Sequence, residues 1–178
     1  MLTRNEQLPL RKKDDNMEIE RKFTIKKMPE DIEMYDKRII EQAYLCTKPV
    51  IRVRRDNEKY YLTCKGSGLT AHTELEFPLD ERSYEHMKNK ADGNIISKTR
   101  FMIPIDKPMF KDGYVPADGL KLTVELDIFD APFSPLVIAE VEFPDIQTCE
   151  AYTPEPWFDS DVTDEKQYHN SYLSSMRF

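Results

Sequence analysis

The sequence predicts a mainly β domain of the α+β class, with about eight antiparallel strands and helices packed outside. Apolar and polar residues alternate along a series of short segments, which is the period of a strand that buries only one face. The 12 prolines fall largely between these segments and mark the loops. A few other segments have the spacing of short helices. Together these observations predict a sheet protein with one apolar and one charged face.

Length and composition indicate one folded unit. The chain has 178 residues, of which 33% are charged, but its 11% of aromatic residues argue against general disorder. Residues 1–16 are polar and contain the charge run "RKKDDN", so they are predicted to be a disordered N-terminal arm. Residues 17–178 are predicted to form a single domain, and Met17 is a candidate native start.

Charge and hydropathy exclude several classes of function. The net charge of −7 disfavours general binding to nucleic acids or anionic membranes, which depends on an excess of Lys and Arg. The sequence has no apolar run long enough to span a membrane and no apolar stretch of a secretory signal near Met1. The widely spaced Cys46, Cys64 and Cys149 are expected to be reduced thiols. We therefore expect a cytoplasmic protein, either a monomer or a homodimer.

The elements follow in order along the chain. A short helix is predicted within 29–42. Longer helices are predicted at 79–92, ending near Gly93, and at 161–176, where Thr163 is the candidate N-cap. The strands are predicted from alternation at 17–23, 42–45, 50–55, 60–66, 72–77, 97–101, 121–129 and 139–143.

The polar faces of these strands are sorted by the sign of their charge. One alternating strand is usually just solvated on its polar side, but here like charges recur two residues apart, about 7 Å along a strand. Such neighbours repel unless something compensates them. Divalent cations relieve clustered carboxylates, and phosphates relieve clustered Lys and Arg. The like pairs are Glu18 with Glu20, Arg52 with Arg54, Glu74 with Glu76, Lys98 with Arg100, Glu125 with Asp127, and Glu140 with Glu142.

This sorting predicts a ligand that is itself a metal-bound polyanion. If about eight strands close into a barrel, the interior has room for one small ligand. The charged faces would then line the interior and the apolar faces would be covered by helices outside.

The stretch "EIERKF" at 18–23 resembles the E-x-E-x-K signature of the CYTH domain of the triphosphate tunnel metalloenzymes. Further segments resemble that family in order, including "VIRVRR", "YYLTCKG", "TELEF", "SKTRF", "VELDIF" and "AEVEF". The resemblance implies a closed eight-stranded antiparallel tunnel that binds a linear triphosphate and hydrolyses it with a divalent metal.

The resemblance also implies roles for individual residues. The triphosphate would be bound by Lys22, Arg52, Arg54, Lys65, Lys98 and Arg100. The catalytic carboxylates, which also hold the metal, would be Glu18, Glu20, Glu140 and Glu142, with Glu125 and Asp127 as further metal ligands. A site of carboxylate oxygens suits Mg²⁺ or Mn²⁺.

The roles of three further residues are less specific. His72 stands where the family commonly has a basic residue, and we interpret it as a weakened phosphate contact, because strand histidines are more often structural than catalytic. Glu74 and Glu76 either bind metal or orient the basic side chains.

The motifs do not fix the substrate. The short chain and its similarity to simple bacterial members favour inorganic tripolyphosphate. A thiamine or nucleoside triphosphatase, or an adenylyl cyclase of the same fold, remains an alternative. A non-catalytic module that binds polyphosphate or nucleotides ranks lower, because it would not need the acidic residues, and a structural barrel with outward charges ranks lower still.

Overall fold

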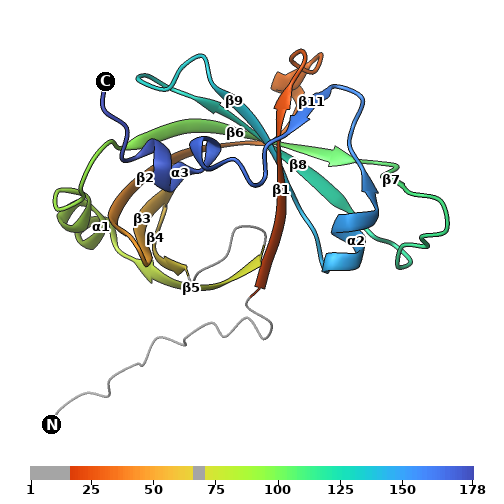
Figure 1. Ribbon diagram of the computed structural model, residues 1–178. Helices are drawn as coiled ribbons and strands as arrows, with labels where there is room; N and C mark the ends of the chain where they lie inside the picture. Colours follow the sequence, from red (N-terminus) through yellow and green to blue (C-terminus); the bar gives the residue numbers. More distant parts are fainter. Residues whose placement is uncertain (1–16, 66–70) are drawn as a thin grey trace, which may run out of the picture.

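Antiparallel strands dominate the molecule, and the few helices are short (Figure 1). The computed structural model describes residues 17–65 and 71–178, apart from the side chains of Met17 and residues 71–74. The predicted mainly β class is confirmed. The predicted N-terminal arm, residues 1–16, lies outside the described residues.

One large sheet contains most of the strands. Its members are β1 (Met17–Ile25), β2 (Lys37–Thr47), β3 (Val50–Asp56), β4 (Lys59–Lys65), β5 (Ala71–Leu79), β6 (Ile96–Ile105), β8 (Leu122–Phe129), β9 (Val137–Glu142) and β11 (Phe158–Asp161). A separate ribbon pairs β7 (Met109–Phe110) with β10 (Tyr152–Thr153). The helices are η1 (Ile32–Met34), α1 (Glu81–Lys88), α2 (Ile146–Ala151), η2 (Lys166–Tyr168) and α3 (Asn170–Leu173).

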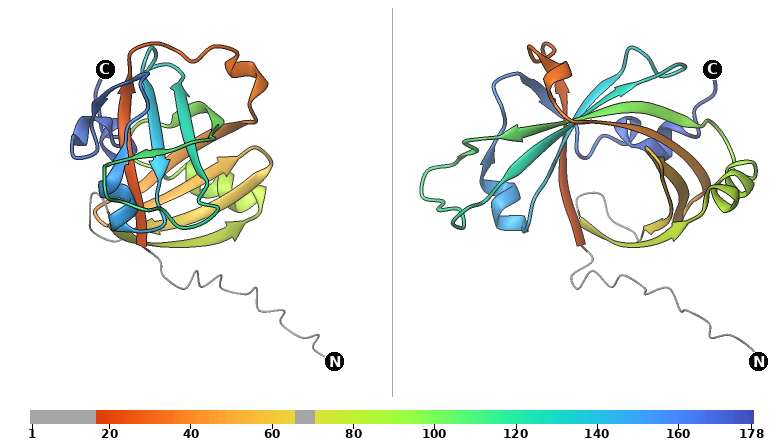
Figure 2. Two further views of the ribbon diagram at one scale, coloured as in Figure 1. Left: turned by 90° about the vertical axis from the view of Figure 1, so that its right-hand side faces the viewer. Right: turned by 180° about the vertical axis from the view of Figure 1, so that it is seen from behind.

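Strand β1 has partners on both of its edges. Met17–Ile19 pair with β5, and the following residues, 20–23, pair with β9. The order of pairing runs from β1 through β5, β4, β3, β2, β6 and β8 to β9, and the β1–β9 pairing leads back to β1. Strands β2 to β5 curve strongly, as the view from behind shows (Figure 2).

The apolar face of this sheet points outward and is covered by helices and loops. Beside α1, the buried side chains of Ala43, Val53 and Tyr84 form one cluster. Helix α1 lies within the predicted 79–92 but ends at Lys88, short of Gly93. It begins at Glu81, because the Asp80 side chain accepts a hydrogen bond from the Ser83 amide at 2.6 Å and so caps the first turn.

A larger cluster fills the space between the other half of the sheet and α2. It includes Phe23, Leu126, Val141 and Tyr152, all at most 1% exposed. The charged residues that alternate with these apolar ones therefore face the opposite side of the sheet.

Arg21 departs from the alternation of β1, and the structure explains why. It lies on the outer face, where its guanidinium donates to Asp161 Oδ2 from Nε at 2.9 Å and from Nη2 at 2.7 Å. Its Nη1 donates to the carbonyl of Tyr152 at 3.1 Å. Arg21 thus ties β1 to β11 and to the end of α2.

The short helix predicted within 29–42 is found only as the 3₁₀ helix η1, and the chain is a strand from Lys37 onward. Residues of β2 pair with β3 on one side and with β6 on the other. Two ladders of hydrogen bonds, together with the β-branched pair Ile39–Ile40, outweigh the helical spacing of this segment.

The predicted C-terminal helix is much shorter than 161–176 and is divided into η2 and α3. Thr163 does not cap it. Its hydroxyl accepts a hydrogen bond from the Lys22 amide at 3.0 Å and donates to Asp161 Oδ1 at 2.5 Å. The expectation that all helices lie outside the sheet also fails here, because Leu173 of α3 packs with Tyr44 on the inward face of β2.

Replacing Asp161, the carboxylate that binds Arg21, should weaken the attachment of β11 to β1. We expect Asp161→Asn to lower the free energy of unfolding by about 1 kcal/mol, a value reduced for the partial exposure of the ion pair. Asp159→Asn, an exposed position on the same strand, should stay within about 0.5 kcal/mol of the wild type. Urea unfolding measures both. Equal stabilities for the two variants would contradict an anchoring role.

Candidate functional site

The charged inward face encloses one cavity of about 500 Å³. It is lined by side chains from β1, β2, β3, β4, β6, β8, β9 and the C-terminal segment. The predicted site residues among its lining are Glu18, Glu20, Lys22, Arg52, Arg54, Lys65, Arg100, Glu125, Glu140 and Glu142. Residues that are far apart in the sequence are therefore brought together as the sorting by charge predicted.

Strand register places charged side chains beside one another in the acidic wall, the part of the cavity formed by β1, β8 and β9. Lys22 of β1 lies opposite Glu140 of β9, and Glu140 in turn lies opposite Glu125 of β8. Glu20 is in register with Glu142. Each strand thus presents alternate residues to the cavity and the intervening residues to the apolar core.

Lys22 is buried and bound by two carboxylates. Its Nζ lies 2.5 Å from Glu140 Oε1 and 3.1 Å from Glu20 Oε1. Burial alone would lower the pKa of Lys22, but Glu140 and Glu20 raise it above its ordinary value. Lys22 therefore stays protonated.

Glu140 connects Lys22 to Arg100. Its Oε2 accepts a hydrogen bond from Arg100 Nη2 at 2.6 Å. Burial would raise the pKa of Glu140, but Lys22 and Arg100 hold it well below its usual range. A negative charge is thus fixed between two cations.

Arg100 of β6 is bonded to three carboxylates of β8 and β9. Asp127 accepts from its Nε at 2.6 Å and from its Nη2 at 2.7 Å, and Glu125 accepts from its Nη1. These carboxylates raise the pKa of Arg100 although burial opposes the charge.

Two predicted site residues are fully buried and do not lie on the cavity surface. The side chains of Lys98 and Asp127 are 0% exposed and form an ion pair with each other. Neither is among the residues that line the cavity. Burial lowers the pKa of Lys98 to about 8, with Asp127 opposing the shift.

The opposite part of the cavity, the basic wall, is formed by β2, β3 and the segment between them. Arg52 and Arg54 project from β3, and Arg54 Nη2 donates to Gln42 Oε1 at 3.3 Å. Lys65 of β4 lies at the junction with β1, where its Nζ is 2.5 Å from Glu18 Oε2.

Sequence reasoning missed the uncharged polar residues of the inward face. Gln42 and Thr63 are both 0% exposed, and Gln42 Nε2 and Thr63 Oγ1 have no hydrogen-bond partner among the described residues. Thr63 is in register with Arg52, and Gln42 with Arg54. In the alternating pattern of their strands, both residues fall on the same face as the charged residues. This position is the signal that could have identified them.

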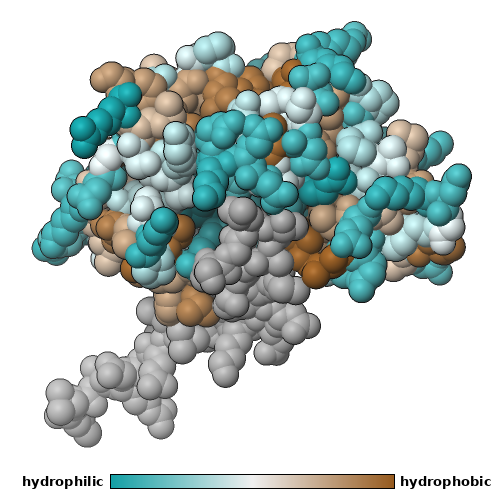
Figure 3. All heavy atoms as spheres, viewed as in Figure 1, coloured by the Kyte–Doolittle hydropathy of each residue, from teal (hydrophilic) through white to brown (hydrophobic). Residues whose placement is uncertain are grey.

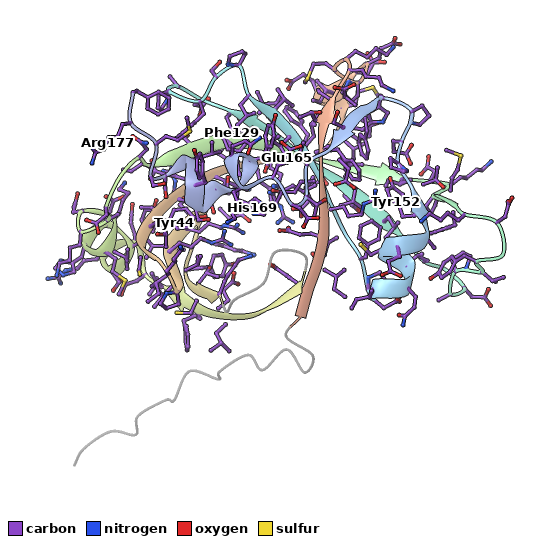
Figure 4. The ribbon with its side chains drawn as sticks, viewed as in Figure 1. Tyr44, Phe129, Tyr152, Glu165, His169 and Arg177 are labelled. Carbon is purple, nitrogen blue, oxygen red and sulfur yellow. The ribbon has the colours of Figure 1, made fainter. Side chains whose placement is uncertain are left out.

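The C-terminal segment contributes a further part of the lining that was not predicted. It supplies Lys166, His169, Asn170, Ser171, Tyr172 and Ser175. His169 Nε2 lies 2.8 Å from the carbonyl oxygen of Thr163, which fixes the ring at the start of α3. Figure 4 shows Tyr44 and His169 on the same side of the molecule, near α3. Hydrophilic side chains gather over this part of the surface (Figure 3).

The remaining predicted residues lie on β5. The side chains of His72 and Glu74 are outside the described residues, although the His72 backbone pairs with Glu18. Glu76 is exposed and in register with Thr63, and it does not line the cavity.

The carboxylates of the acidic wall match a hard divalent cation in kind. Oxygen ligands are what Mg²⁺ and Mn²⁺ prefer. Within 17–65 and 71–178, however, no three carboxylate, His or Cys side chains already form a metal cluster. Lys22, Lys65 and Arg100 occupy carboxylate oxygens instead, so a metal would have to share or displace these contacts.

None of the described helices has the length and apolar character that crossing a membrane requires.

Comparisons with known proteins identify the family. No family model matches the chain. An inorganic triphosphatase of Nitrosomonas europaea is 32% identical over 160 residues, which cover 88% of this chain and 96% of that protein. The crystal structure of an inorganic triphosphatase superposes with a TM-score of 0.60 and 30% identity, covering 88% of this chain and 93% of the other.

A Pyrococcus horikoshii protein, PH1012, shares the fold with a TM-score of 0.50 at 22% identity, over 75% of this chain and 82% of that one. The fold and the cavity define a β protein whose charged interior is lined by strands and by the C-terminal segment. The chain belongs to the CYTH family of triphosphate tunnel proteins.

Removing the charge of Glu140 should destabilise the protein strongly. Glu140→Gln leaves Lys22 and Arg100 in a buried site with one less anion, and we expect a loss of about 3 kcal/mol at neutral pH. Because the pKa of Glu140 is lowered in the folded state, its contribution is present above the ordinary value of 4.5 and is lost as the pH falls below it.

The matched control is Glu142→Gln, at an exposed position on the same strand. Urea unfolding at pH 7 and in acid should show a large gap between the two variants that narrows at low pH. A gap that does not depend on pH would rule out the electrostatic explanation.

Proposed function

We propose that the protein hydrolyses a triphosphate, with inorganic tripolyphosphate as the substrate, and releases phosphate. The observation that carries this proposal is the meeting of a basic and an acidic wall in one cavity of about 500 Å³. The named inorganic triphosphatases that match this chain over most of its length support it. We further propose that the ring of strand pairings acts as a closed tunnel around the substrate.

The basic wall would bind the phosphates. Arg52 and Arg54 project from one strand into the cavity, and their planar guanidinium groups suit pairs of phosphoryl oxygens. Lys65 supplies a compact charge at the edge of this wall. Lys22 and Arg100 lie beside the acidic wall, where they would contact the terminal phosphate of the substrate that reacts.

The acidic wall would hold a divalent cation. Glu18, Glu20, Glu140 and Glu142 line the cavity with Glu125, and we propose them as the ligands of Mg²⁺ or Mn²⁺. When bound, such an ion neutralises phosphate charge and makes a bound water more acidic. Asp127 is fully buried and does not line the cavity, so the structure supports a ligand role for it less than for the others.

The side chains would then divide the work of phosphoryl transfer. One carboxylate of the acidic wall orients the attacking water toward a terminal phosphorus. Lys22 and Arg100, which stay protonated, stabilise the charge on the transferring group and on the leaving phosphate. Little covalent chemistry is required of the protein, because positioning and charge supply most of the rate in such reactions.

A second candidate is hydrolysis of an organic triphosphate, such as a nucleotide or thiamine triphosphate. Two aromatic side chains, Tyr44 and Tyr172, line the cavity, and Tyr172 is 46% exposed. An aromatic ring at an accessible position can stack on a base or a thiazole ring.

The substrate preference is tested by phosphate release from tripolyphosphate, ATP and thiamine triphosphate, each with and without Mg²⁺. We expect turnover that requires Mg²⁺ and is highest with tripolyphosphate. A higher rate with ATP or thiamine triphosphate would favour the second candidate. Binding without turnover of any of the three would overturn the hydrolase.

Neutralising one proposed metal ligand should abolish most turnover and leave the fold intact. Glu20→Gln keeps the shape of the side chain, and we expect phosphate release to fall on the order of 100-fold or more. EDTA should have the same effect on the wild type. Glu33→Gln, at an exposed position that does not line the cavity, is the control. Full activity of Glu20→Gln, or activity in EDTA, would refute the metal mechanism.

Ligand binding should stabilise the wild type through Arg52. At a tripolyphosphate concentration 100 times the dissociation constant, linkage adds about 2.7 kcal/mol. We expect Arg52→Ala to lose most of this gain, whereas Arg82→Ala on the exposed face of α1 should keep it. Thermal melts in EDTA, with and without tripolyphosphate, measure the shift without turnover. Equal shifts in all three proteins would show that Arg52 does not bind the substrate.

A further inference from the structure

Arg38 is a cation of the cavity lining that the pattern of like charges does not include, because the next residue on its face of β2 is Ile40. Both residues line the cavity. The side chain of Arg38 is 47% exposed, whereas that of Arg100 is 8% exposed. Arg38 therefore lies where the cavity opens to solvent.

This opening is at the end of β2 that lies away from the C-terminal segment. Tyr44 also lines the cavity, and Leu173 of α3 packs against it. Arg38 and Tyr44 share one face of β2 and are about 20 Å apart along the strand. An anion that enters beside Arg38 does not need to pass α3.

Arg38 of β2 is in register with Arg100 of β6. Side chains in directly opposite positions are close neighbours on one face of a sheet, and like charges there repel. Here the two guanidinium groups are drawn to opposite sides. Arg100 binds Asp127 of β8 and Glu140 of β9, whereas Arg38 binds Asp56 of β3, and β2 and β6 lie between these strands. The arrangement suits an anion that binds between the two arginines.

Asp56 holds Arg38 only weakly. Arg38 Nη1 lies 3.3 Å from Asp56 Oδ2, which is longer than is usual for a hydrogen bond between two charged groups. Solvent screens this contact further, because the Arg38 side chain is half exposed. By contrast, the bonds from Arg100 to Asp127 are 2.6 and 2.7 Å long. Arg38 can thus exchange its carboxylate for another anion at small cost.

We propose that Arg38 is a further substrate-binding residue, which leaves Asp56 to bind a phosphoryl group of the triphosphate at the opening of the cavity. Its planar guanidinium can donate to two phosphoryl oxygens at once. Asp56 also lines the cavity, and its negative charge competes with the substrate for Arg38. The inference rests on the proposed function, because it takes a triphosphate as the anion. It assigns Arg38 to binding and leaves the chemical step to the acidic wall.

The first test measures the binding of tripolyphosphate in EDTA by titration calorimetry, so that no turnover occurs. We expect Arg38→Gln to raise Kd on the order of 10-fold, as for the loss of one charge-assisted contact. The control is Lys37→Gln, which removes an exposed cation on the same strand that pairs with Glu33 and does not line the cavity. Its Kd should stay within about twofold of the wild type. An equal Kd for wild type and Arg38→Gln would overturn the inference.

The second test uses a change with the opposite expected sign, which a folding defect would not produce. Asp56→Asn releases Arg38 and should lower Kd on the order of threefold. Glu58→Gln, at an exposed position outside the cavity lining, should leave Kd unchanged. In the Arg38→Gln background Asp56→Asn should have a smaller effect, because the cation it holds is absent. The same gain in both backgrounds would contradict the exchange of partners.

Phosphate release with Mg²⁺ separates this inference from the proposed function. Arg38→Gln should raise KM on the order of 10-fold and leave kcat within about twofold, as when binding alone is weakened. A lower kcat with an unchanged KM would place Arg38 in the chemical step and overturn its binding role. If the wild type binds tripolyphosphate without releasing phosphate, the proposed function fails, and the Kd values still decide the role of Arg38.

Discussion

The acidic wall depends on the contact of one buried carboxylate with two cations. Glu140 binds Lys22 at 2.5 Å and Arg100 at 2.6 Å, and these join β1 and β6 to β9. A buried cation is costly without a carboxylate partner, and Glu140 serves both of these cations. The register of the strands puts Lys22 opposite Glu140, and Arg100 reaches Glu140 across β8, so the ladder of backbone hydrogen bonds and the pattern of charges support each other. The charged interior is thus part of the fold and not an addition to it.

The sequence predicted best those features that depend only on the alternation of residues along a strand. Residues 50–55 and 121–129 alternate over most of their length, and β3 and β8 appear there with Arg52, Arg54 and Glu125 lining the cavity. Alternation indicates which face of the sheet a side chain occupies, but it does not indicate how deeply that side chain is buried. For this reason Lys98 and Arg100 looked equivalent, although Lys98 is fully buried and only Arg100 lines the cavity.

Long-range pairing explains most of the errors. The strand at Lys37–Thr47 is held by two neighbours that are distant in sequence, and no local pattern reports their presence. The C-terminal residues have helical spacing, but Thr163 and Asp161 are engaged by Lys22 and Arg21 of β1, which keeps the chain extended there. Gln42 and Thr63 were overlooked because uncharged residues give no sorting by sign.

The protein as a whole is negatively charged, but one wall of its cavity is positively charged. This difference affects how an anionic substrate approaches. The protein carries a net charge of −7, yet its basic wall presents Arg52 and Arg54 to an anion. At a distance a polyphosphate meets repulsion, and attraction begins only near the opening. At physiological ionic strength the screening length is about 8 Å, so salt weakens the long-range repulsion between the protein and the substrate. The attraction between the enclosed arginines and the substrate is screened much less. Dissolved salt should therefore hasten the encounter up to a point, the reverse of the steering by which basic proteins capture anions.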